Sequence, residues 1–125
     1  MTENEVAKTV VNICFKIHST LGPGLLESVY EEVLFYELGK HRLQSDRQVP
    51  IPVVYEKIEM PIGFRADIIV EDELILELKS VETLAPVHYK QLLTYLKITG
   101  LKLGLLINFN VPLIKNGIFR VVNQL

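Results

Sequence analysis

The positions of apolar and polar residues along the chain predict two helices, three strands, a third helix and two final strands. Thr2 and Glu5 have the spacing of a helix-capping box, and the apolar residues that follow recur at helical spacing, at Val6, Val10, Ile13 and Ile17. The sequence Gly22-Pro23-Gly24 separates this helix from a second one, which is expected to run to about Gly39.

The remaining elements follow from the same kinds of pattern. Strands are expected at Gln48 to Tyr55, Met60 to Val70, Leu74 to Ser80, Lys102 to Asn108 and, after an Asn116-Gly117 turn, Ile118 to Val122. Pro86 suits the first position of a helix and Gly100 its end, which predicts a helix from Pro86 to Thr99. The order ααβββαββ predicts an α/β fold with a mixed central sheet flanked by helices, and residues 1–125 are expected to form a single domain.

Charged residues occupy one face of the second and third predicted strands. Asp67 alternates with apolar neighbours in the second strand, as Glu77 and Lys79 do in the third. The acidic run Glu71-Asp72-Glu73 between them is predicted to be a turn. If it forms a three-residue loop, Asp67 lies directly opposite Glu77 on the same face, and the same register places Arg65 opposite Lys79. A loop shorter by one residue would place the two carboxylates on opposite faces.

Two opposed carboxylates destabilise a sheet unless a cation lies between them, because their Cβ atoms are only about 4.5 to 5.5 Å apart. Oxygen ligands of this kind suit Mg²⁺ or Mn²⁺, and Mg²⁺ keeps several waters beside one or two carboxylates. Lys79 points into the same space, where its ammonium group can orient a water or stabilise charge on a phosphate. The alternative is a solvated hairpin with charged outward side chains, and an isolated D…ExK spacing favours that alternative because such patterns recur by chance.

The helix predicted from Pro86 to Thr99 adds polar residues to this set, because Gln91 and Tyr95 share one of its faces. An acidic residue, an apolar-E-x-K strand and a helix with Q-x-x-x-Y together resemble the signature of the RecB-like branch of the PD-(D/E)XK nuclease superfamily. The chain carries this set as Asp67, Glu77-Leu78-Lys79 and Gln91-Leu92-Leu93-Thr94-Tyr95. The full set is far more specific than any part of it.

A further motif lies near the N-terminus, where Gly24, Glu27 and Tyr30 have G-x-x-E-x-x-Y spacing. The chain thereby resembles the small GxxExxY family, which is assigned to the same superfamily, and the resemblance extends from about residue 18 to about residue 118. It implies that Glu27 is a further acid of the site, bound to the metal directly or through water. It also implies that the Leu78 carbonyl is an additional metal ligand.

Several of these residues also have simpler explanations. Glu27 lies in the first turn of its helix, where a carboxylate stabilises the helix by about 0.3 to 1 kcal/mol through the helix dipole. Tyr30 is either a core aromatic with a tethered hydroxyl or a residue that holds Glu27. Gln91 and Tyr95 either contact a metal-bound water or a substrate phosphate, or lie on a helix surface. His18 and His88 are expected to be packed or surface residues rather than ligands, because a hard oxygen site has no need of imidazole.

The composition indicates a soluble intracellular protein. With 49% hydrophobic and 22% charged residues, the 125-residue chain is long enough to bury a core. Its single cysteine, Cys14, lies in an apolar helical run and excludes an intramolecular disulfide or a cysteine-based zinc site. The pattern predicts neither a signal peptide nor an apolar span of membrane length. We therefore expect a cytoplasmic location and no membrane partner.

Net charge is the main argument against nucleic-acid binding. The 13 Lys and Arg residues against 15 Asp and Glu give a net charge of −2, whereas a stand-alone nucleic-acid binder is usually basic. Several of the acids belong to the predicted metal site, whose effective charge changes once an ion is bound. Lys40, Arg42 and Arg47 offer a small basic patch that could contact phosphate, but the pattern favours a solvated charged surface for any one of them.

These observations favour a nuclease that depends on Mg²⁺ or Mn²⁺ and hydrolyses nucleic acid, with DNA as the expected substrate. Asp67 and Glu77 would hold the metal, Lys79 would orient the attacking water, and Gln91 with Tyr95 would position the substrate or the lysine. Two alternatives remain open at this stage. One is a non-catalytic interaction module or subunit of a larger nucleic-acid processing complex, and the other is hydrolysis of a small nucleotide. A homodimer and a partner protein subunit are both compatible with the sequence.

Overall fold

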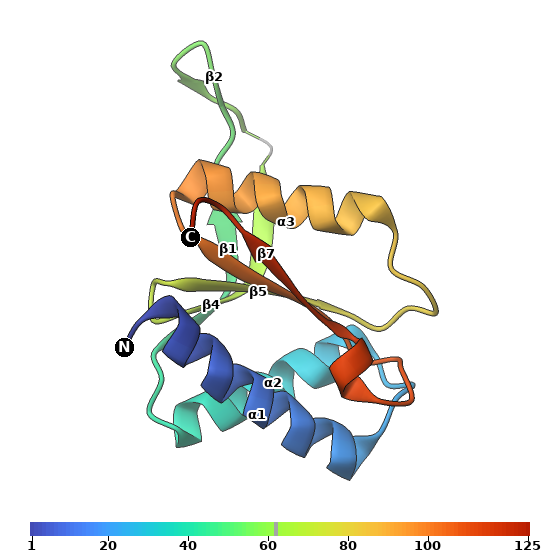
Figure 1. The fold of residues 1–125 in the computed structure, drawn as a ribbon. Coiled ribbons are helices and arrows are strands. Elements are labelled where there is room, and N and C mark those ends of the chain that lie inside the picture. The colour runs from blue at the N-terminus through green and yellow to red at the C-terminus, as the bar shows by residue number, and fades with distance from the viewer. Residues whose placement is uncertain (62) are drawn as a thin grey trace.

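A five-stranded mixed sheet lies between two layers of helix in the computed structural model, which describes residues 1–61 and 63–125 (Figure 1). Helices α1 (Glu3–Leu21) and α2 (Glu27–Lys40) cover one face, and α3 (Pro86–Thr99) covers the other. The strand order is β1 (Ser45–Ile51), β4 (Phe64–Val70), β5 (Leu74–Lys79), β6 (Leu103–Asn108) and β7 (Ile118–Val122). β5 and β6 run parallel, whereas the other neighbouring strands run antiparallel. The predicted mixed α/β fold is therefore confirmed.

The predicted boundaries of the first two strands are wrong. The strand expected from Gln48 to Tyr55 begins at Ser45 and ends at Ile51, and the strand expected from Met60 begins at Phe64. Ile62, which the prediction included in a strand, lies outside the described residues. The other strands and α3 agree with the prediction to within one residue.

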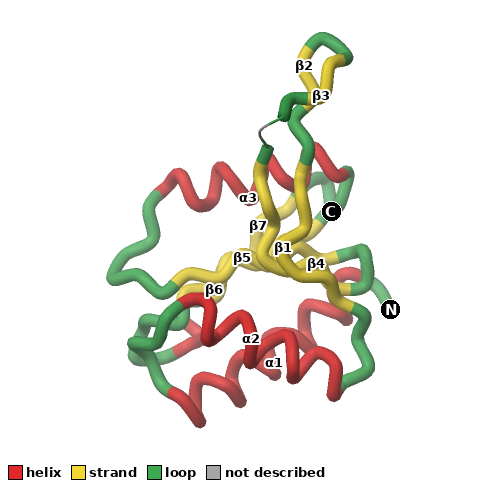
Figure 2. The backbone as a smooth tube through the Cα atoms, turned by 180° about the vertical axis from the view of Figure 1, so that it is seen from behind, coloured by secondary structure: helices red, strands yellow, loops and turns green. Residues whose placement is uncertain are grey.

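The segment between β1 and β4 forms a separate hairpin, with strands β2 (Val54–Tyr55) and β3 (Ile58–Glu59), that projects from the sheet (Figure 2). We refer to residues 53–60 as the arm. Its turn residues Glu56 and Lys57 have φ angles of 51° and 66°, as a type I′ turn requires. Such turns usually contain Asn-Gly or Asp-Gly, so Glu-Lys carried no turn signal in the sequence.

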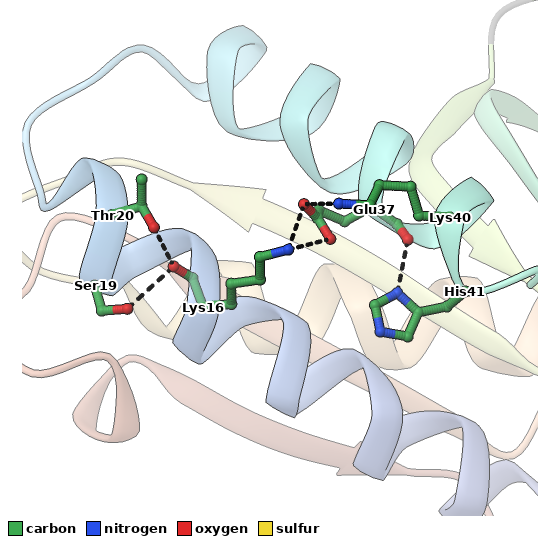
Figure 3. Close-up of polar contacts among 6 residues, drawn as sticks. All are labelled: Lys16, Ser19, Thr20, Glu37, Lys40 and His41. Atoms are coloured by element: carbon green, nitrogen blue, oxygen red, sulfur yellow. Dashed lines mark hydrogen bonds and ion pairs between the residues drawn. The ribbon is translucent and has the colours of Figure 1, made fainter.

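A mostly buried carboxylate holds α1 against α2. The Glu37 carboxylate accepts hydrogen bonds from Lys16 Nζ at 3.1 and 3.2 Å and from Lys40 Nζ at 3.5 Å (Figure 3). His41, the C-cap residue of α2, places its Nδ1 2.9 Å from the Glu37 carbonyl oxygen. Lys40, which the sequence suggested as part of a basic patch, is therefore paired with an acid.

α1 is anchored by residues whose structural roles the sequence predicted. The Thr2–Glu5 capping box is present at its start. Cys14 is fully buried, and burial raises the pKa of its thiol to about 12. His18 is buried, and its Nε2 lies 2.8 Å from the Val111 carbonyl oxygen. Within the described residues, no helix is both long enough and apolar enough to cross a membrane.

The alternation of core residues along β4 breaks at Asp67. Ile68 and Val70 belong to the core beneath α1 and α2, but Ala66 belongs to the core beneath α3. The same break occurs on β1 at Gln48, which has a φ angle of 50°, because the next residue, Val49, packs on the α3 side. The β1–β4 pair therefore twists at Gln48 and Asp67. Beyond this twist, Val49 of β1 and Ala66 of β4 pack in the core beneath α3.

The β4–β5 hairpin has the register that a three-residue loop predicts, with Val70 opposite Leu74. Pairing continues to Ile68 opposite Leu76, and beyond this point β4 leaves β5. Because the pairing with β5 does not reach Arg65, which pairs only with Pro50 of β1, the prediction that Arg65 lies opposite Lys79 is wrong. The hairpin is therefore regular up to the position of the two carboxylates and open beyond it.

Tyr30 is a core aromatic whose hydroxyl fixes the loop before α2. Its ring stacks on Phe109 with a centroid distance of 4.3 Å. Its hydroxyl donates to the Gly22 carbonyl oxygen at 2.6 Å and accepts from the Leu25 backbone N–H at 3.1 Å. Of the two roles that the sequence left open, the structure shows the core role with a tethered hydroxyl. Through this loop, Tyr30 acts on the position of Glu27 indirectly.

Replacing Tyr30 by Phe tests this role. Tyr30→Phe keeps the stacked ring but removes both hydrogen bonds, and we expect a loss of about 1 to 3 kcal/mol in the free energy of unfolding. Urea denaturation measures this loss. Tyr36→Phe is the matched control, because Tyr36 is 64% exposed and its hydroxyl should contribute nothing measurable. Equal stability of the two variants would contradict the assigned role.

Candidate metal centre

Asp67 and Glu77 meet where β4 leaves β5. Oε1 of Glu77 accepts a hydrogen bond from the Asp67 backbone N–H at 3.1 Å, and Oδ2 of Asp67 accepts one from the Leu78 backbone N–H at 2.8 Å. These bonds continue the hairpin where backbone pairing stops, after Ile68 and Leu76. The two carboxylates are thus held together by the backbone of the strands that carry them.

Burial of this pair changes its protonation. Glu77 is 5% exposed, and burial, followed by the negative charge of Asp67, raises the pKa of Glu77 from 4.5 to about 8. Burial also raises the pKa of Asp67, and the charges of Glu31 and Glu27 act in the same direction. The Leu78 N–H and the Lys79 ammonium oppose this rise. In the absence of a cation, the folded pair therefore retains a proton near neutral pH.

Helix α2 brings two further acids to the same place. Glu27 and Glu31 lie one turn apart and line a cavity of about 270 Å³ together with Ser28, Gln48, Asp67 and Leu78. Oε2 of Glu27 accepts a hydrogen bond from the Ser80 backbone N–H at 3.3 Å, and the Ser80 hydroxyl donates to the Leu25 carbonyl oxygen at 2.6 Å. These contacts tie the loop before α2 to the end of β5.

Lys79, Gln91 and Tyr95 also lie near the carboxylate pair. The positive charge of Lys79 favours the ionised forms of both Asp67 and Glu77. Tyr95 is 3% exposed, which excludes the surface position that the sequence left open for it. Burial, then the charges of Glu77 and Asp67, raises the pKa of the Tyr95 hydroxyl to about 12, and the Gln91 side chain opposes this shift. The hydroxyl of Tyr95 therefore stays protonated beside the acids.

The sequence analysis missed Glu31 and Gln48. Oε1 of Glu31 accepts a hydrogen bond from Gln48 Nε2 at 2.6 Å, and Oε2 accepts from Arg47 at 2.9 Å. Gln48 Nε2 also lies 3.5 Å from Oδ1 of Asp67. The four-residue spacing from Glu27 to Glu31 places both acids on one helix face and was the available signal for Glu31. Nothing in the sequence marked Gln48.

The predicted basic patch of Lys40, Arg42 and Arg47 is also wrong as a free surface. Arg47 forms ion pairs with Glu31 at 2.9 Å and with Glu32 at 2.7 Å, and Lys40 is paired with Glu37. Lys40 and Arg47 therefore form ion pairs with acidic residues of α2.

The donors of this site suit a small, hard cation. They are carboxylate oxygens, which Mg²⁺ and Mn²⁺ prefer as ligands. Within residues 1–61 and 63–125, no three His, Cys, Asp or Glu side chains are gathered closely enough to hold a metal ion by themselves. Mg²⁺ binds proteins through one or two carboxylates and completes its coordination with water and phosphate oxygens, so the Asp67–Glu77 pair fits this ion. A cation would also relieve the repulsion that raises the pKa of Glu77.

Comparison with known proteins identifies the superfamily of the chain. Residues 4–121 match the family model of the PD-(D/E)XK nuclease superfamily. The chain belongs to this superfamily. Its members are generally nucleases that use divalent metals such as Mg²⁺ or Mn²⁺, so membership supports a hydrolytic enzyme with a nucleic-acid substrate. No curated protein and no solved structure shows significant similarity to the chain.

The buried acid pair predicts a pH dependence of stability in EDTA. Because the pKa of Glu77 is higher in the folded protein than in the unfolded chain, stability should fall as the pH rises from about 4.5 to about 8. The total change is expected to be on the order of a few kcal/mol. Glu77→Gln keeps an acceptor for the Asp67 N–H but cannot ionise, so this variant should lose most of the slope.

Thermal melts at both ends of this pH window measure the effect. Glu82→Gln is the matched control, because Glu82 is exposed and the variant should retain the slope of the parent protein. A parent protein whose melting temperature is constant across the window would show that Glu77 is not buried as a protonated acid.

Proposed function

We propose that this protein is a nuclease of the GxxExxY family, in the RecB-like branch of the superfamily, and that it hydrolyses phosphodiester bonds in DNA with Mg²⁺ or Mn²⁺. The observation that carries the proposal is a pair of hydrogen bonds at the opening of the β4–β5 hairpin, in which the Glu77 carboxylate accepts from the Asp67 N–H and the Asp67 carboxylate accepts from the Leu78 N–H. This arrangement opposes stability without a cation, which is typical of residues retained for function.

Asp67 and Glu77 would hold the metal, with the Leu78 carbonyl as an additional ligand. Glu27 supplies a further acid, bound to the metal directly or through water, since it lines the same cavity as Asp67 and Leu78. When bound, the metal would activate water and neutralise charge on the scissile phosphate. The hydrogen bonds of Asp67 and Glu77 to backbone N–H groups orient the oxygens before any substrate arrives.

Lys79 follows Glu77 by two residues, and its positive charge opposes the rise in the pKa of both Asp67 and Glu77. We assign it the role of orienting the attacking water and stabilising charge on the phosphate in the transition state. The buried Tyr95 hydroxyl and the Gln91 amide would position Lys79 or the substrate. Glu31 is a positioning residue in this scheme, because it holds Gln48 against Asp67.

A non-catalytic module is the second candidate, and the charge distribution favours it. Arg47, whose partner Glu31 lines the cavity, is already bound to Glu31 and Glu32. With a net charge of −2, the chain then offers few unpaired cations near the site for a long nucleic acid. A partner subunit that supplies basic surface, or a substrate as small as a nucleotide, would remove this difficulty.

Lys79→Ala distinguishes catalysis from binding alone. The variant should retain binding of Mn²⁺ and of nucleic acid but lose cleavage by at least ~100-fold, because only the chemical step needs the ammonium group. The measurement is a cleavage assay on DNA, RNA and a small nucleotide with each metal. Lys102→Ala serves as the matched control, because Lys102 is exposed and lies outside the proposed site.

Metal-dependent cleavage that persists unchanged in Lys79→Ala would refute the assigned role of the lysine. If the parent protein cleaves none of the three substrates, and a missing partner subunit has been tested and excluded, the non-catalytic module becomes the better assignment.

Asp67→Asn separates a metal ligand from a structural residue. The Asn side-chain oxygen can still accept the hydrogen bond from Leu78, and the repulsion with Glu77 is removed. In EDTA the variant should therefore melt at the same temperature as the parent protein or higher. With Mn²⁺ it should lose the stabilisation that the parent protein gains. A clearly lower melting temperature in EDTA would indicate that Asp67 serves the fold rather than the metal.

A further inference from the structure

The arm, residues 53–60, exposes apolar side chains that the fold does not cover. Val54, Tyr55 and Ile58 are 61%, 67% and 62% exposed. The arm projects from the body of the protein as a two-stranded hairpin (Figures 1 and 2). A two-stranded hairpin alone is marginally stable in water, so these side chains gain most from a surface that covers them.

The charge of the arm restricts what that surface can be. The arm contains Glu56 and Glu59 but only one cation, Lys57, and so has a net charge of −1. Phosphates would repel it, which excludes nucleic acid as its main contact. The complementary surface must be apolar and basic.

A groove with these properties lies between α1 and β7, the strand at one edge of the sheet. Its volume is about 400 Å³, and Ala7, Val11, Leu105 and Ile118 contribute apolar lining. Lys8, Lys115 and Arg120 also line it, and no acidic residue does. Within the described part of the chain, none of these three cations forms an ion pair. Phe15, which is 45% exposed, completes the lining.

The arm cannot fill the groove of its own chain. In both overall views the arm projects from the end of the molecule opposite α1, which forms one wall of the groove (Figures 1 and 2). An arm-to-groove contact must therefore join two copies. A single contact of this kind would leave one arm and one groove free, whereas two contacts related by a two-fold axis satisfy both and close the assembly.

We infer that two copies of this chain form a symmetric dimer in which the arm of each copy, with Val54, Tyr55 and Ile58, occupies the groove between α1 and β7 of the other. Glu56 and Glu59 face the groove cations across this contact. The inference is independent of the nuclease activity, since the arm and the groove contain none of the residues of the candidate metal centre.

Charge reversal on each surface tests the dimer. The arm variant is Glu56→Lys with Glu59→Lys, and the groove variant is Lys115→Glu with Arg120→Glu. Sedimentation equilibrium of the full chain should give twice the chain mass for the parent protein and the chain mass for each variant alone. An equimolar mixture of the two variants should return to twice the chain mass as a heterodimer. In that heterodimer the arm of the arm variant, now basic, binds the groove of the groove variant, now acidic. The second contact joins the unchanged arm of the groove variant to the unchanged groove of the arm variant.

The mixture also reports on folding, because only folded variants can restore the dimer. Tyr55→Ser is a second arm variant, without a change of charge, and should also give the chain mass. The matched control reverses two exposed cations of α3, Lys90→Glu with Lys97→Glu, and should remain a dimer. Native mass spectrometry of the mixture identifies the heterodimer by the masses of its two variants.

Three outcomes would overturn the inference. The first is a parent protein that remains monomeric throughout the micromolar range, and the second is a dimer that both charge-reversal variants leave intact. The third is a groove variant that keeps the parent mass but binds a fluorescent single-stranded DNA more weakly. That result would assign the groove to nucleic acid instead of the arm.

Discussion

The separation of β4 from β5 after Ile68 and Leu76 is the constraint on which the rest of the site depends. Strands that part inside a protein leave backbone N–H groups without acceptors, and such groups require partners. The carboxylates of Asp67 and Glu77 supply them, for the N–H groups of Leu78 and of Asp67 itself. The bonds that complete the hairpin are thus also the bonds that bring two acids together. An apolar residue at either position would leave a partly buried donor unpaired.

This arrangement carries an energetic cost that the rest of the fold must offset. Burial and mutual repulsion raise the pKa of both acids, so ionising them destabilises the metal-free protein. The apolar cores on the two faces of the sheet supply the opposing stability, and the parallel pair β5–β6 is buried between them. The Glu77 carboxylate therefore lies on a strand that is buried between two cores, which suits oxygens that must keep a fixed geometry.

Two motifs that are distant in sequence lie side by side because short polar contacts join them. Tyr30 holds the loop before α2, and Ser80, the residue after the E-x-K strand, binds both Leu25 and Glu27. The last residue of G-x-x-E-x-x-Y, Tyr30, thus helps to fix the position of the acid that precedes it, Glu27. This gives the tyrosine of the motif a physical role that needs no contact with metal or substrate.

The sequence by itself determined α1 and α3, because the capping box of Thr2 and the residues Pro86 and Gly100 are local signals. For the β4–β5 hairpin it left two loop lengths open, and the structure has the three-residue loop. The sequence also singled out Asp67, Glu77 and Glu27, but not Glu31. Only the tertiary structure decided the twist at Gln48 and Asp67, the arm, and the pairing of Arg47 with Glu31. The twist and the Arg47–Glu31 pair depend on contacts between segments distant in the chain, and the energy of such contacts overrides local propensity. The arm is a local hairpin, but its Glu56-Lys57 turn lacks the Asn-Gly or Asp-Gly sequence that usually marks such turns.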